Sequence, residues 1–277
     1  MQLQNSHLCI VNILRDASAK LKDVAQRPQN EAKILLSHIL DVEQIWLITH
    51  SQHEVTDEQY NQFTRLVERR VGYEPIEYIT NRVSFYSNTF FIKEGALIPR
   101  PETEILVDLA LKYIKPKMKI AEIGVGSGAL SVTLCKLHSD ITVIATDISE
   151  DALFVARKNI KDNHLEEQIT LINTDLLNGV EEKLDIIISN PPYIANECKL
   201  DANLDYEPSI ALYGGDVGDE LLLCIINEAV SREVKFLLCE MGYDQRENIQ
   251  TYCKEHALNV EFYKDLSKLD RGFIIEF

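Results

Sequence analysis

The most informative segment for the fold is Glu122-Ile-Gly-Val-Gly-Ser-Gly-Ala129, which follows an apolar run and precedes the helix-like Leu130-Ser-Val-Thr-Leu-Cys-Lys-Leu137. Each of its three glycines lacks the Cβ that would hinder a sharp turn or the close approach of a ligand. The spacing G-x-G-x-G differs from the G-x-G-x-x-G of dinucleotide binding and from the phosphate-binding G-x-x-x-x-G-K-[ST]. By itself, the loop is consistent with a tight structural turn or with a ligand-binding turn.

Strand and helix patterns alternate on both sides of this loop, from Lys117 to the carboxyl terminus. Helical patterns separate most of the strands, for example over 150–163 and 244–256. Alternation of this kind predicts an α/β layer fold with a mostly parallel sheet and right-handed crossovers. The seven expected strands cover 118–123, 141–148, 169–176, 184–189, 234–240, 260–264 and 272–277.

Acidic residues occur near the ends of the next two strands. Asp147 lies 19 residues after Gly128, where a carboxylate can accept hydrogen bonds from ribose hydroxyls. Asp175-Leu176 ends the third expected strand, beside the position of an adenine. Ligands of open α/β sheets bind outside the carboxyl ends of the strands, so these features together predict an adenosyl ligand. The missing phosphate motifs favour a methyl donor without phosphate.

The fourth expected strand is followed by Asn190-Pro-Pro-Tyr193. Pro191 and Pro192 have no N–H, so carbonyls here stay free, and the Asn190 amide oxygen with the Pro191 carbonyl can accept both hydrogens of a planar NH₂ group. Tyr193 is expected to supply an aromatic wall. An amide or aryl amine nitrogen is a poor nucleophile, so the site must orient it and stabilise the positive charge that develops on it. We expect no strong general base.

The first 78 residues carry helical periodicity and predict a small helical bundle, in which Asp57 is expected to cap a helix. A structural cap and a partner-docking module are both consistent with this segment. Residues 79–97 are aromatic and β-branched and predict a β-hairpin linker with a turn at Ser87-Asn88. The catalytic domain is then expected over 98–277.

Composition narrows the partners. Lys and Arg number 28 and Asp and Glu 44 over 277 residues, which gives a formal net charge of −16. This excess argues against a basic nucleic-acid groove and against an anionic membrane surface. The six cysteines are scattered without a Cys-x-x-Cys pair, so we expect no metal. We see neither a signal sequence nor an apolar run of membrane-spanning length, so a cytoplasmic location is expected.

At these motifs the chain resembles the class I S-adenosyl-L-methionine-dependent methyltransferases, with a Rossmann-like sheet, and more narrowly the HemK/PrmC family. Leu97-Ile-Pro-Arg-Pro-Glu-Thr-Glu104 and Glu207-Pro-Ser-Ile-Ala-Leu-Tyr-Gly-Gly215 narrow the resemblance. It implies transfer of a methyl group from S-adenosyl-L-methionine, which becomes S-adenosyl-L-homocysteine, to the N5 amide of a glutamine in the Gly-Gly-Gln loop of peptide chain release factors. It further implies that Asn190, Pro191, Pro192 and Tyr193 hold the glutamine, and that the donor is bound by Gly124, Val125, Gly126, Ser127, Gly128, Asp147, Leu176 and Asn190.

Some positions depart from the family pattern. Leu176 stands where some relatives have an aromatic residue, and Tyr73 and Asn81 stand where we expect glycine. The roles of Glu122, Arg100 and Glu102 stay open between the pocket and the structure around it. Because Asn-Pro-Pro-Tyr also occurs in adenine-N6 methyltransferases of nucleic acids, that activity is the alternative. A non-catalytic adaptor that binds the donor is a third possibility, against which the intact tetrapeptide argues.

Overall fold

The computed structural model describes residues 8–200 and 204–277 and divides into two compact units, Met1–Asn81 and Arg82–Phe277. The hairpin that we expected to link two domains is grouped with the second unit. Residues 1–7 of the expected helical domain and 201–203 of the expected catalytic domain lie outside the described residues.

Helices form the described part of the first unit, and one apolar cluster holds them together. Leu35 of the second helix and Phe63 and Val67 of the fourth are almost fully buried in this cluster. Phe63 and Val67 are one turn apart and therefore face the same side of their helix. The helices are α1 (Ile10–Lys20), α2 (Pro28–Leu40), α3 (Gln44–Thr49), α4 (Asp57–Val71) and α5 (Ile76–Thr80).

The amino-terminal cap of α4 differs from the expectation by one residue. Thr56, and not Asp57, is the cap: its Oγ1 accepts the Gln59 N–H at 3.2 Å, and its own N–H donates to Gln59 Oε1 at 2.9 Å. This reciprocal pair is a capping box, which satisfies two N–H groups that the helix leaves unpaired. Asp57 is the first residue of the helix, where its charge favours the positive end of the helix dipole.

Tyr73 and Asn81, which stand where we expect glycine, both have left-handed backbone, with φ of 70° and 54°. A side chain with a Cβ is strained in this region, so the expectation of glycine has a conformational reason at both positions.

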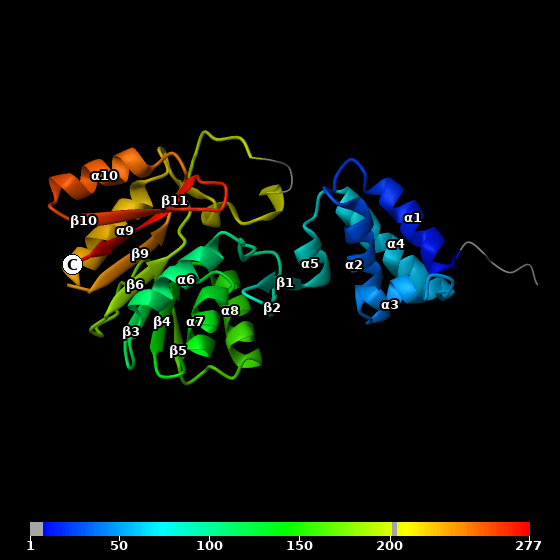
Figure 1. The fold of residues 1–277 in the computed structure, drawn as a ribbon, viewed down its shortest axis with the longest axis horizontal. Coiled ribbons are helices and arrows are strands. Elements are labelled where there is room, and N and C mark those ends of the chain that lie inside the picture. Colours follow the sequence, from blue (N-terminus) through cyan, green and yellow to red (C-terminus); the bar gives the residue numbers. More distant parts are fainter. Residues whose placement is uncertain (1–7, 201–203) are drawn as a thin grey trace, which may run out of the picture. The chain divides into compact units, whose positions relative to one another are not determined.

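The second unit contains a seven-stranded sheet in the order β10-β11-β9-β6-β3-β4-β5 (Figure 1). The five strands β9, β6, β3, β4 and β5 are parallel to one another, and β11 and β10 are antiparallel additions beside β9. The strands are β3 (Lys119–Ile123), β4 (Thr142–Asp147), β5 (Ile169–Asn173), β6 (Ile186–Ser189), β9 (Phe236–Glu240), β10 (Asn259–Lys264) and β11 (Asp270–Glu276). The expectation of a mostly parallel sheet of seven strands is confirmed.

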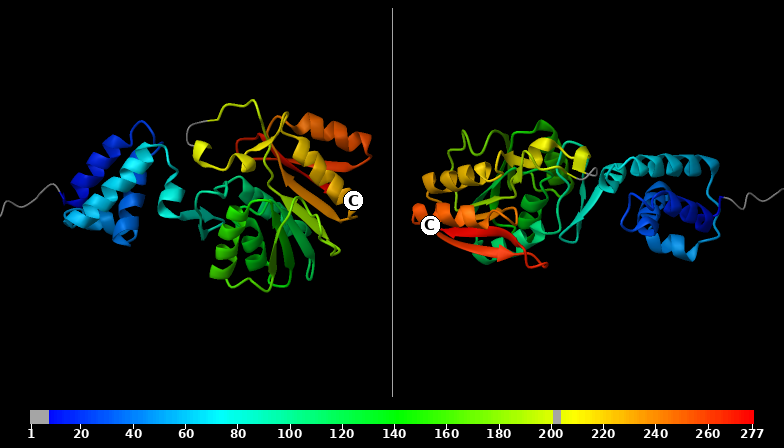
Figure 2. Two further views of the ribbon diagram at one scale, coloured as in Figure 1. Left: turned by 180° about the vertical axis from the view of Figure 1, so that it is seen from behind. Right: turned by 90° about the horizontal axis from the view of Figure 1, so that it is seen from above.

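Helices cover both faces of this sheet (Figures 1 and 2). Ala121 and Ile123 of β3 share a buried cluster with Ile225, so α9 and α10 lie over their face. Glu122 points to the opposite face, where it contacts Ser131 of α7. The helices are α6 (Thr103–Tyr113), α7 (Ala129–Leu137), α8 (Glu150–Asp162), α9 (Glu220–Ser231) and α10 (Arg246–Glu255).

Smaller elements stand at the edges of the sheet. The hairpin β1 (Arg82–Phe85) and β2 (Asn88–Phe91) turns at Tyr86-Ser87, one residue earlier than expected, because Asn88 already pairs with Phe85. Two further short strands, β7 (Ile194–Ala195) and β8 (Tyr213–Gly215), pair with each other, and 3₁₀ turns cover η2 (Leu204–Tyr206) and η3 (Ser209–Ala211).

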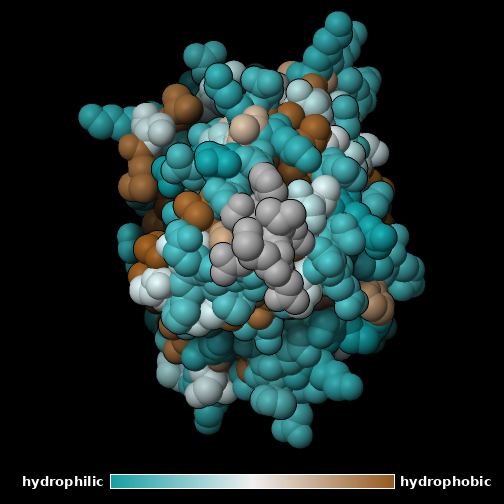
Figure 3. Space-filling view, turned by 90° about the vertical axis from the view of Figure 1, so that its right-hand side faces the viewer, coloured by the Kyte–Doolittle hydropathy of each residue, from teal (hydrophilic) through white to brown (hydrophobic). Residues whose placement is uncertain are grey.

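The face drawn in Figure 3 is mostly hydrophilic, with hydrophobic side chains in small groups. Within residues 8–200 and 204–277, the structure has no helix with the length and apolar character that crossing a membrane requires.

Candidate active site

A cavity opens at the carboxyl ends of β3, β4 and β6, where the chain order of the parallel strands reverses. This is the place where open α/β sheets bind ligands. Its empty volume, counted together with the solvent in its open mouth, is about 1020 Å³. Its lining includes residues 122–127, 146–149 and 174–176 together with Asn190 and Pro192.

The glycine loop between β3 and α7 is held by main-chain hydrogen bonds. The N–H groups of Gly124 and Val125 both donate to the Thr146 carbonyl at 2.9 Å, which fixes the loop to the end of β4. Gly128 caps α7 with φ of 78°, and a Cβ there would lie 3.3 Å from Ala156. Both the left-handed backbone and the close helix contact therefore call for glycine at this position.

Asp147 lies at the end of β4 with each carboxylate oxygen on a different main-chain N–H. Oδ2 accepts from Gly126 and Oδ1 from Ser149, both at 2.9 Å. A carboxylate has about four acceptor sites, so acceptor capacity remains toward the cavity that Asp147 lines. Burial raises its pKa, and the main-chain donors oppose that shift.

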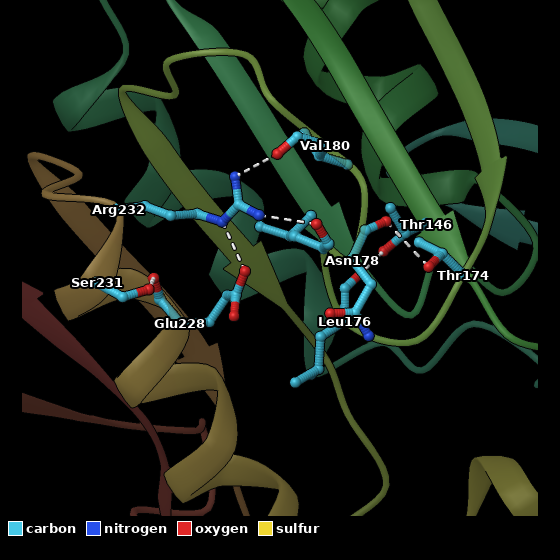
Figure 4. A network of polar contacts seen from close by, with 9 residues as sticks. Thr146, Thr174, Leu176, Asn178, Val180, Glu228, Ser231 and Arg232 are labelled. Carbon is cyan, nitrogen blue, oxygen red and sulfur yellow. Dashed lines mark hydrogen bonds and ion pairs between the residues drawn. The ribbon is translucent and has the colours of Figure 1, made fainter.

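Leu176 lies in the loop after β5, not at the strand's end as expected, because the strand stops at Asn173 and Leu176 turns left-handed with φ of 49°. A polar network holds this loop (Figure 4). Thr146 Oγ1 donates to the Leu176 carbonyl at 2.7 Å. From the end of α9, Arg232 donates to the carbonyls of Leu177 at 2.7 Å and Val180 at 2.9 Å, and it pairs with Glu228 at 2.6 Å. This part of the cavity wall is thus fixed through its carbonyls.

Glu122 is the titratable group most deeply placed in the cavity wall, with 4% of its surface exposed. Its carboxylate accepts the Ser131 N–H at 3.1 Å and also bonds the Ser131 hydroxyl. Burial outweighs these bonds and raises the pKa of Glu122 to about 8. Glu122 therefore has both a structural contact and a place in the pocket.

Asn190 begins a chain of side-chain hydrogen bonds. Its Nδ2 donates to Thr103 Oγ1 at 2.9 Å, and Thr103 Oγ1 donates to Glu240 Oε2 at 2.7 Å. The Tyr193 hydroxyl donates to Glu240 Oε1 at 3.4 Å. These residues come from the tetrapeptide, from the start of α6 and from the end of β9, so three separate segments meet behind Asn190.

The segment 207–218 supports the tetrapeptide through its main chain. A Cβ at Gly214 would lie 2.4 Å from the Pro192 carbonyl oxygen, so only glycine allows this approach. Gln245 Nε2 donates to the carbonyls of Tyr193 at 3.0 Å and Gly218 at 2.8 Å. The backbone of the tetrapeptide is therefore held from two sides.

Arg100 and the Ile98 N–H both contact the buried Glu207. Arg100 Nη2 lies 2.6 Å from Glu207 Oε1, and the Ile98 N–H donates to Oε2 at 3.0 Å. Arg100 thus pins its loop to the segment after residue 204, and neither Arg100 nor Glu102 is among the residues that line the cavity.

Most of the expected site residues share one cavity, which is lined by Gly124, Val125, Gly126, Ser127, Asp147, Leu176, Asn190 and Pro192. Gly128, Pro191 and Tyr193 do not line it, since Gly128 faces α8 and the Tyr193 hydroxyl turns to Glu240. Sequence reasoning missed Phe85 of the hairpin, and it missed Thr103 and Pro208 although both stand in motifs that it singled out. Over the described ranges, no cluster of three or more His, Cys, Asp or Glu side chains is arranged to hold a metal ion.

Comparisons with known proteins agree with this geometry. The model of the PrmC N-terminal domain matches residues 12–80, and that of the methyltransferase small domain matches residues 101–204. The release factor glutamine methyltransferase of Clostridium acetobutylicum is 34% identical over 274 residues, which cover 93% of this chain and 96% of that protein. Its counterpart in Neisseria gonorrhoeae is 36% identical over 256 residues, or 90% and 93% of the two chains.

A solved structure shares the fold of the second unit. The ribosomal protein L11 methylase of Lactobacillus delbrueckii subsp. bulgaricus superposes with a TM-score of 0.50 at 25% identity, over 67% of this chain and 83% of that one. The match extends the agreement from sequence to the arrangement of sheet and helices. With relatives above 30% identity over nearly the whole length of both chains, this chain belongs to the release factor glutamine methyltransferase family.

Proposed function

We propose that this protein transfers a methyl group from S-adenosyl-L-methionine to the side-chain amide nitrogen, N5, of the glutamine in the Gly-Gly-Gln loop of peptide chain release factors. The observation that carries the proposal is that Asn190 lines the same cavity as the glycine loop and Asp147. An amide acceptor and a nucleoside-binding carboxylate thus face one space. The family membership supports the same reaction.

The residues on the donor side fit an adenosyl methyl donor. Gly124 and Gly126 have open space where a Cβ would stand, so a ligand can lie against their main chain. Asp147 keeps acceptor capacity for ribose hydroxyls, and Leu176 offers an apolar contact for the base. When bound, the donor supplies a sulfonium methyl group as the electrophile. Leu176, Asp147 and the glycine loop would hold adenine, ribose and the amino acid portion, in that order.

The residues on the acceptor side compensate for the weak nucleophilicity of an amide. The Asn190 oxygen and a main-chain carbonyl of the tetrapeptide would accept the two hydrogens of the glutamine NH₂ and turn its nitrogen toward the methyl group, which lowers the entropic part of the barrier. The same acceptors stabilise the positive charge that grows on nitrogen as the N–C bond forms and the C–S electron pair returns to sulfur. The nitrogen then loses a proton to solvent water, and Pro192 and Tyr193 support the backbone that carries these acceptors.

The proposed substrate is accordingly a protein. We expect the reaction to take place in the cytoplasm and without a metal. The helical unit would dock the release factor or act as a cap. The acidic chain, at −16, suits a partner with basic residues near its loop more than a phosphate backbone.

Methyl transfer from labelled donor tests the proposal directly. The purified protein is incubated with a release factor, with the same factor whose loop glutamine is changed to asparagine, and with DNA and RNA. We expect label in the unchanged factor alone, mapped by mass spectrometry to the loop glutamine. Label in nucleic acid but not in the factor would instead establish the adenine-N6 activity that the tetrapeptide also permits, and binding without turnover would establish an adaptor.

A further inference from the structure

The hydrogen bonds from Asn190 to Thr103 and from Thr103 to Glu240 run in one direction, and this direction constrains the Asn190 amide. A threonine hydroxyl carries one proton, and an ionised carboxylate can only accept. Since Glu240 takes the Thr103 proton, the Thr103 oxygen can only accept a hydrogen bond from Asn190. Asn190 must then turn its NH₂ toward Thr103 and its oxygen away from it.

This direction matters because the two ends of an amide have almost the same shape but opposite hydrogen-bonding character. Rotation of the Asn190 amide by half a turn would present NH₂ to the NH₂ of the substrate and remove the acceptor. Thr103 and Glu240 are 6% and 1% exposed, so bulk water does not compete for their hydrogen bonds. An amide beside such a pair has one strongly favoured orientation.

We propose that Thr103 and Glu240 are positioning residues that hold the Asn190 amide with its oxygen toward the substrate nitrogen. The inference rests on the proposed glutamine methylation and names the groups that orient its acceptor. Thr103 and Glu240 act through Asn190 and need no contact with the substrate nitrogen.

The direction of the chain depends on the ionisation of Glu240. Burial raises the pKa of Glu240 to about 7, which the bond from Thr103 and the charge of Arg271 oppose. When protonated, Glu240 can donate to Thr103, whose own proton then turns to Asn190 and favours the rotated amide. Turnover should therefore fall as the pH drops below the pKa of Glu240.

The groups around Glu240 shift its pKa in both directions. Arg271 of β11 and the hydrogen bond from Tyr193 lower the pKa of Glu240, and Glu102, the residue before α6, raises it. Tyr263 of β10 also lies near, and the charge of Glu240 adds to the burial that raises the pKa of Tyr263.

A set of threonine substitutions tests the positioning role. Thr103→Val removes the hydroxyl at nearly constant shape, and Thr103→Ser keeps the hydroxyl. Thr133→Val is the matched control, because Thr133 is 1% exposed on α7 and its hydroxyl has no hydrogen-bond partner among the described residues. The single-turnover rate with saturating donor is measured for each, together with the Kd of the donor by calorimetry.

We expect Thr103→Val to lower the single-turnover rate by about 10- to 100-fold, as misplacement of a reacting group does, with the donor Kd within about twofold of the unchanged protein. Thr103→Ser should restore most of the rate, and Thr133→Val should leave it unaltered. Thr103→Val with the unchanged rate would overturn the proposal, as would Thr103→Ser that is as slow as Thr103→Val.

The pH dependence provides a readout that a merely structural role would not move. In the unchanged protein the single-turnover rate should fall as pH drops through about 7. Glu240→Gln cannot titrate and should flatten this limb, whatever its absolute rate. An identical acid limb in both proteins would overturn the role of Glu240. If the unchanged protein methylates no release factor, the proposed function itself fails; if it does and Thr103→Val matches it, only this inference fails.

Discussion

The proposed donor side of the cavity (Gly124–Gly128, Asp147 and Leu176) is held mainly by contacts between segments close in sequence, with Arg232 beside the Leu176 loop as the exception. The proposed acceptor side (Asn190 with Thr103 and Glu240) is held by side chains from more distant segments. On the donor side, Gly126 bonds Asp147 across 21 residues and Thr146 bonds the Leu176 carbonyl across 30. On the acceptor side, Asn190 bonds Thr103 across 87 residues and Thr103 bonds Glu240 across 137. The first side is built from two successive βα units, and the second exists only once the whole sheet has formed.

This difference predicts different consequences of substitution. Donor contacts are mostly main-chain groups, which a side-chain change reaches only indirectly, so effects there should appear in binding and stability. Acceptor contacts are single side-chain atoms close to the reacting nitrogen, so effects there should appear in turnover. Each substitution below separates these two readouts.

The largest effect is expected for Asn190→Ala. It removes the oxygen that, in the proposed reaction, stabilises charge on the substrate nitrogen, and the loss of one such preorganised hydrogen bond costs about 10²–10³ in rate. The donor Kd should change little, because the glycine loop and Asp147 stay in place. The single-turnover rate and the donor Kd from calorimetry measure the two quantities separately.

Two outcomes at Asn190 would contradict this contrast between binding effects on the donor side and turnover effects on the acceptor side. A turnover rate equal to that of the unchanged protein would remove Asn190 from the chemistry. A donor Kd that weakens as much as the rate would mean that Asn190 belongs to the donor side as well, as the resemblance to relatives also allows.

Asp147→Asn is expected to have the next largest effect, in donor binding. Its two oxygens accept from Gly126 and Ser149, and asparagine can accept on only one side. Loss of one charge-assisted bond and of the ribose contact should weaken the donor Kd by about 10- to 100-fold, equivalent to about 1.4–3 kcal/mol. Turnover at saturating donor should fall much less, and a fall in turnover without weaker binding would contradict the assignment.

The same contrast explains which parts of the fold and of the site the sequence alone predicts. Gly124–Gly128 and Asp147 could be predicted because strand, turn and helix patterns are local and repeat at fixed spacing. The seven strands were found within about two residues at most ends, but the third was drawn to Leu176, whose left-handed φ of 49° no hydrophobic pattern records. The role of a residue in such a turn depends on the hydrogen bonds around it.

The partners of Asn190 lay beyond sequence reasoning for a different reason. Thr103 stands in a motif that was recognised and Glu240 ends an expected strand, but nothing local joins positions 103, 190 and 240. Their contact depends on the order β9-β6-β3 in the sheet, which places the end of β9 beside the end of β6. Phe85 was not predicted for a similar reason. Its hairpin has the sequence pattern of a linker, and only the folded structure places Phe85 in the cavity wall.

A smaller effect, on stability, is expected for alanine at two glycines of the donor loop. Both Gly126 and Gly128 have positive φ, so either alanine costs about 1–2 kcal/mol of backbone strain. Only at Gly128 would the new Cβ also meet a neighbour, Ala156 at 3.3 Å, whereas at Gly126 it enters open space. Gly128→Ala should therefore lower the thermal midpoint more than Gly126→Ala does. Gly126→Ala should lower the affinity for the donor more than Gly128→Ala does.

Thermal unfolding and donor calorimetry on both variants check this pair. Equal losses of midpoint and equal losses of affinity would contradict the distinct placement of the two glycines. Such a result would leave backbone strain as the whole cost at both positions.

The smallest expected effect is on the thermal stability and concerns Glu122. Its carboxylate is held in part by a side chain, that of Ser131, as the groups on the acceptor side are. Its partner Ser131 is only nine residues away, so its contact is local. Because burial raises the pKa of Glu122 from 4.5 to about 8, the folded protein binds a proton there that the unfolded chain has released. The stability from this group is thus complete below pH 4.5 and is lost as pH rises toward 8.

Glu122→Gln removes this titration and stays neutral at every pH. Its thermal midpoint relative to the unchanged protein should therefore rise between pH 5 and pH 8, by about 2–4 °C for each kcal/mol that the ionised carboxylate costs. The other carboxyls whose pKa burial raises, Asp147 and Glu240, are present in both proteins. Parallel midpoint curves over this range would mean that Glu122 ionises freely in the folded protein. The effect of the donor side on stability would then come from its main-chain contacts alone, and the contrast with the effect of the acceptor side on turnover would rest on those contacts.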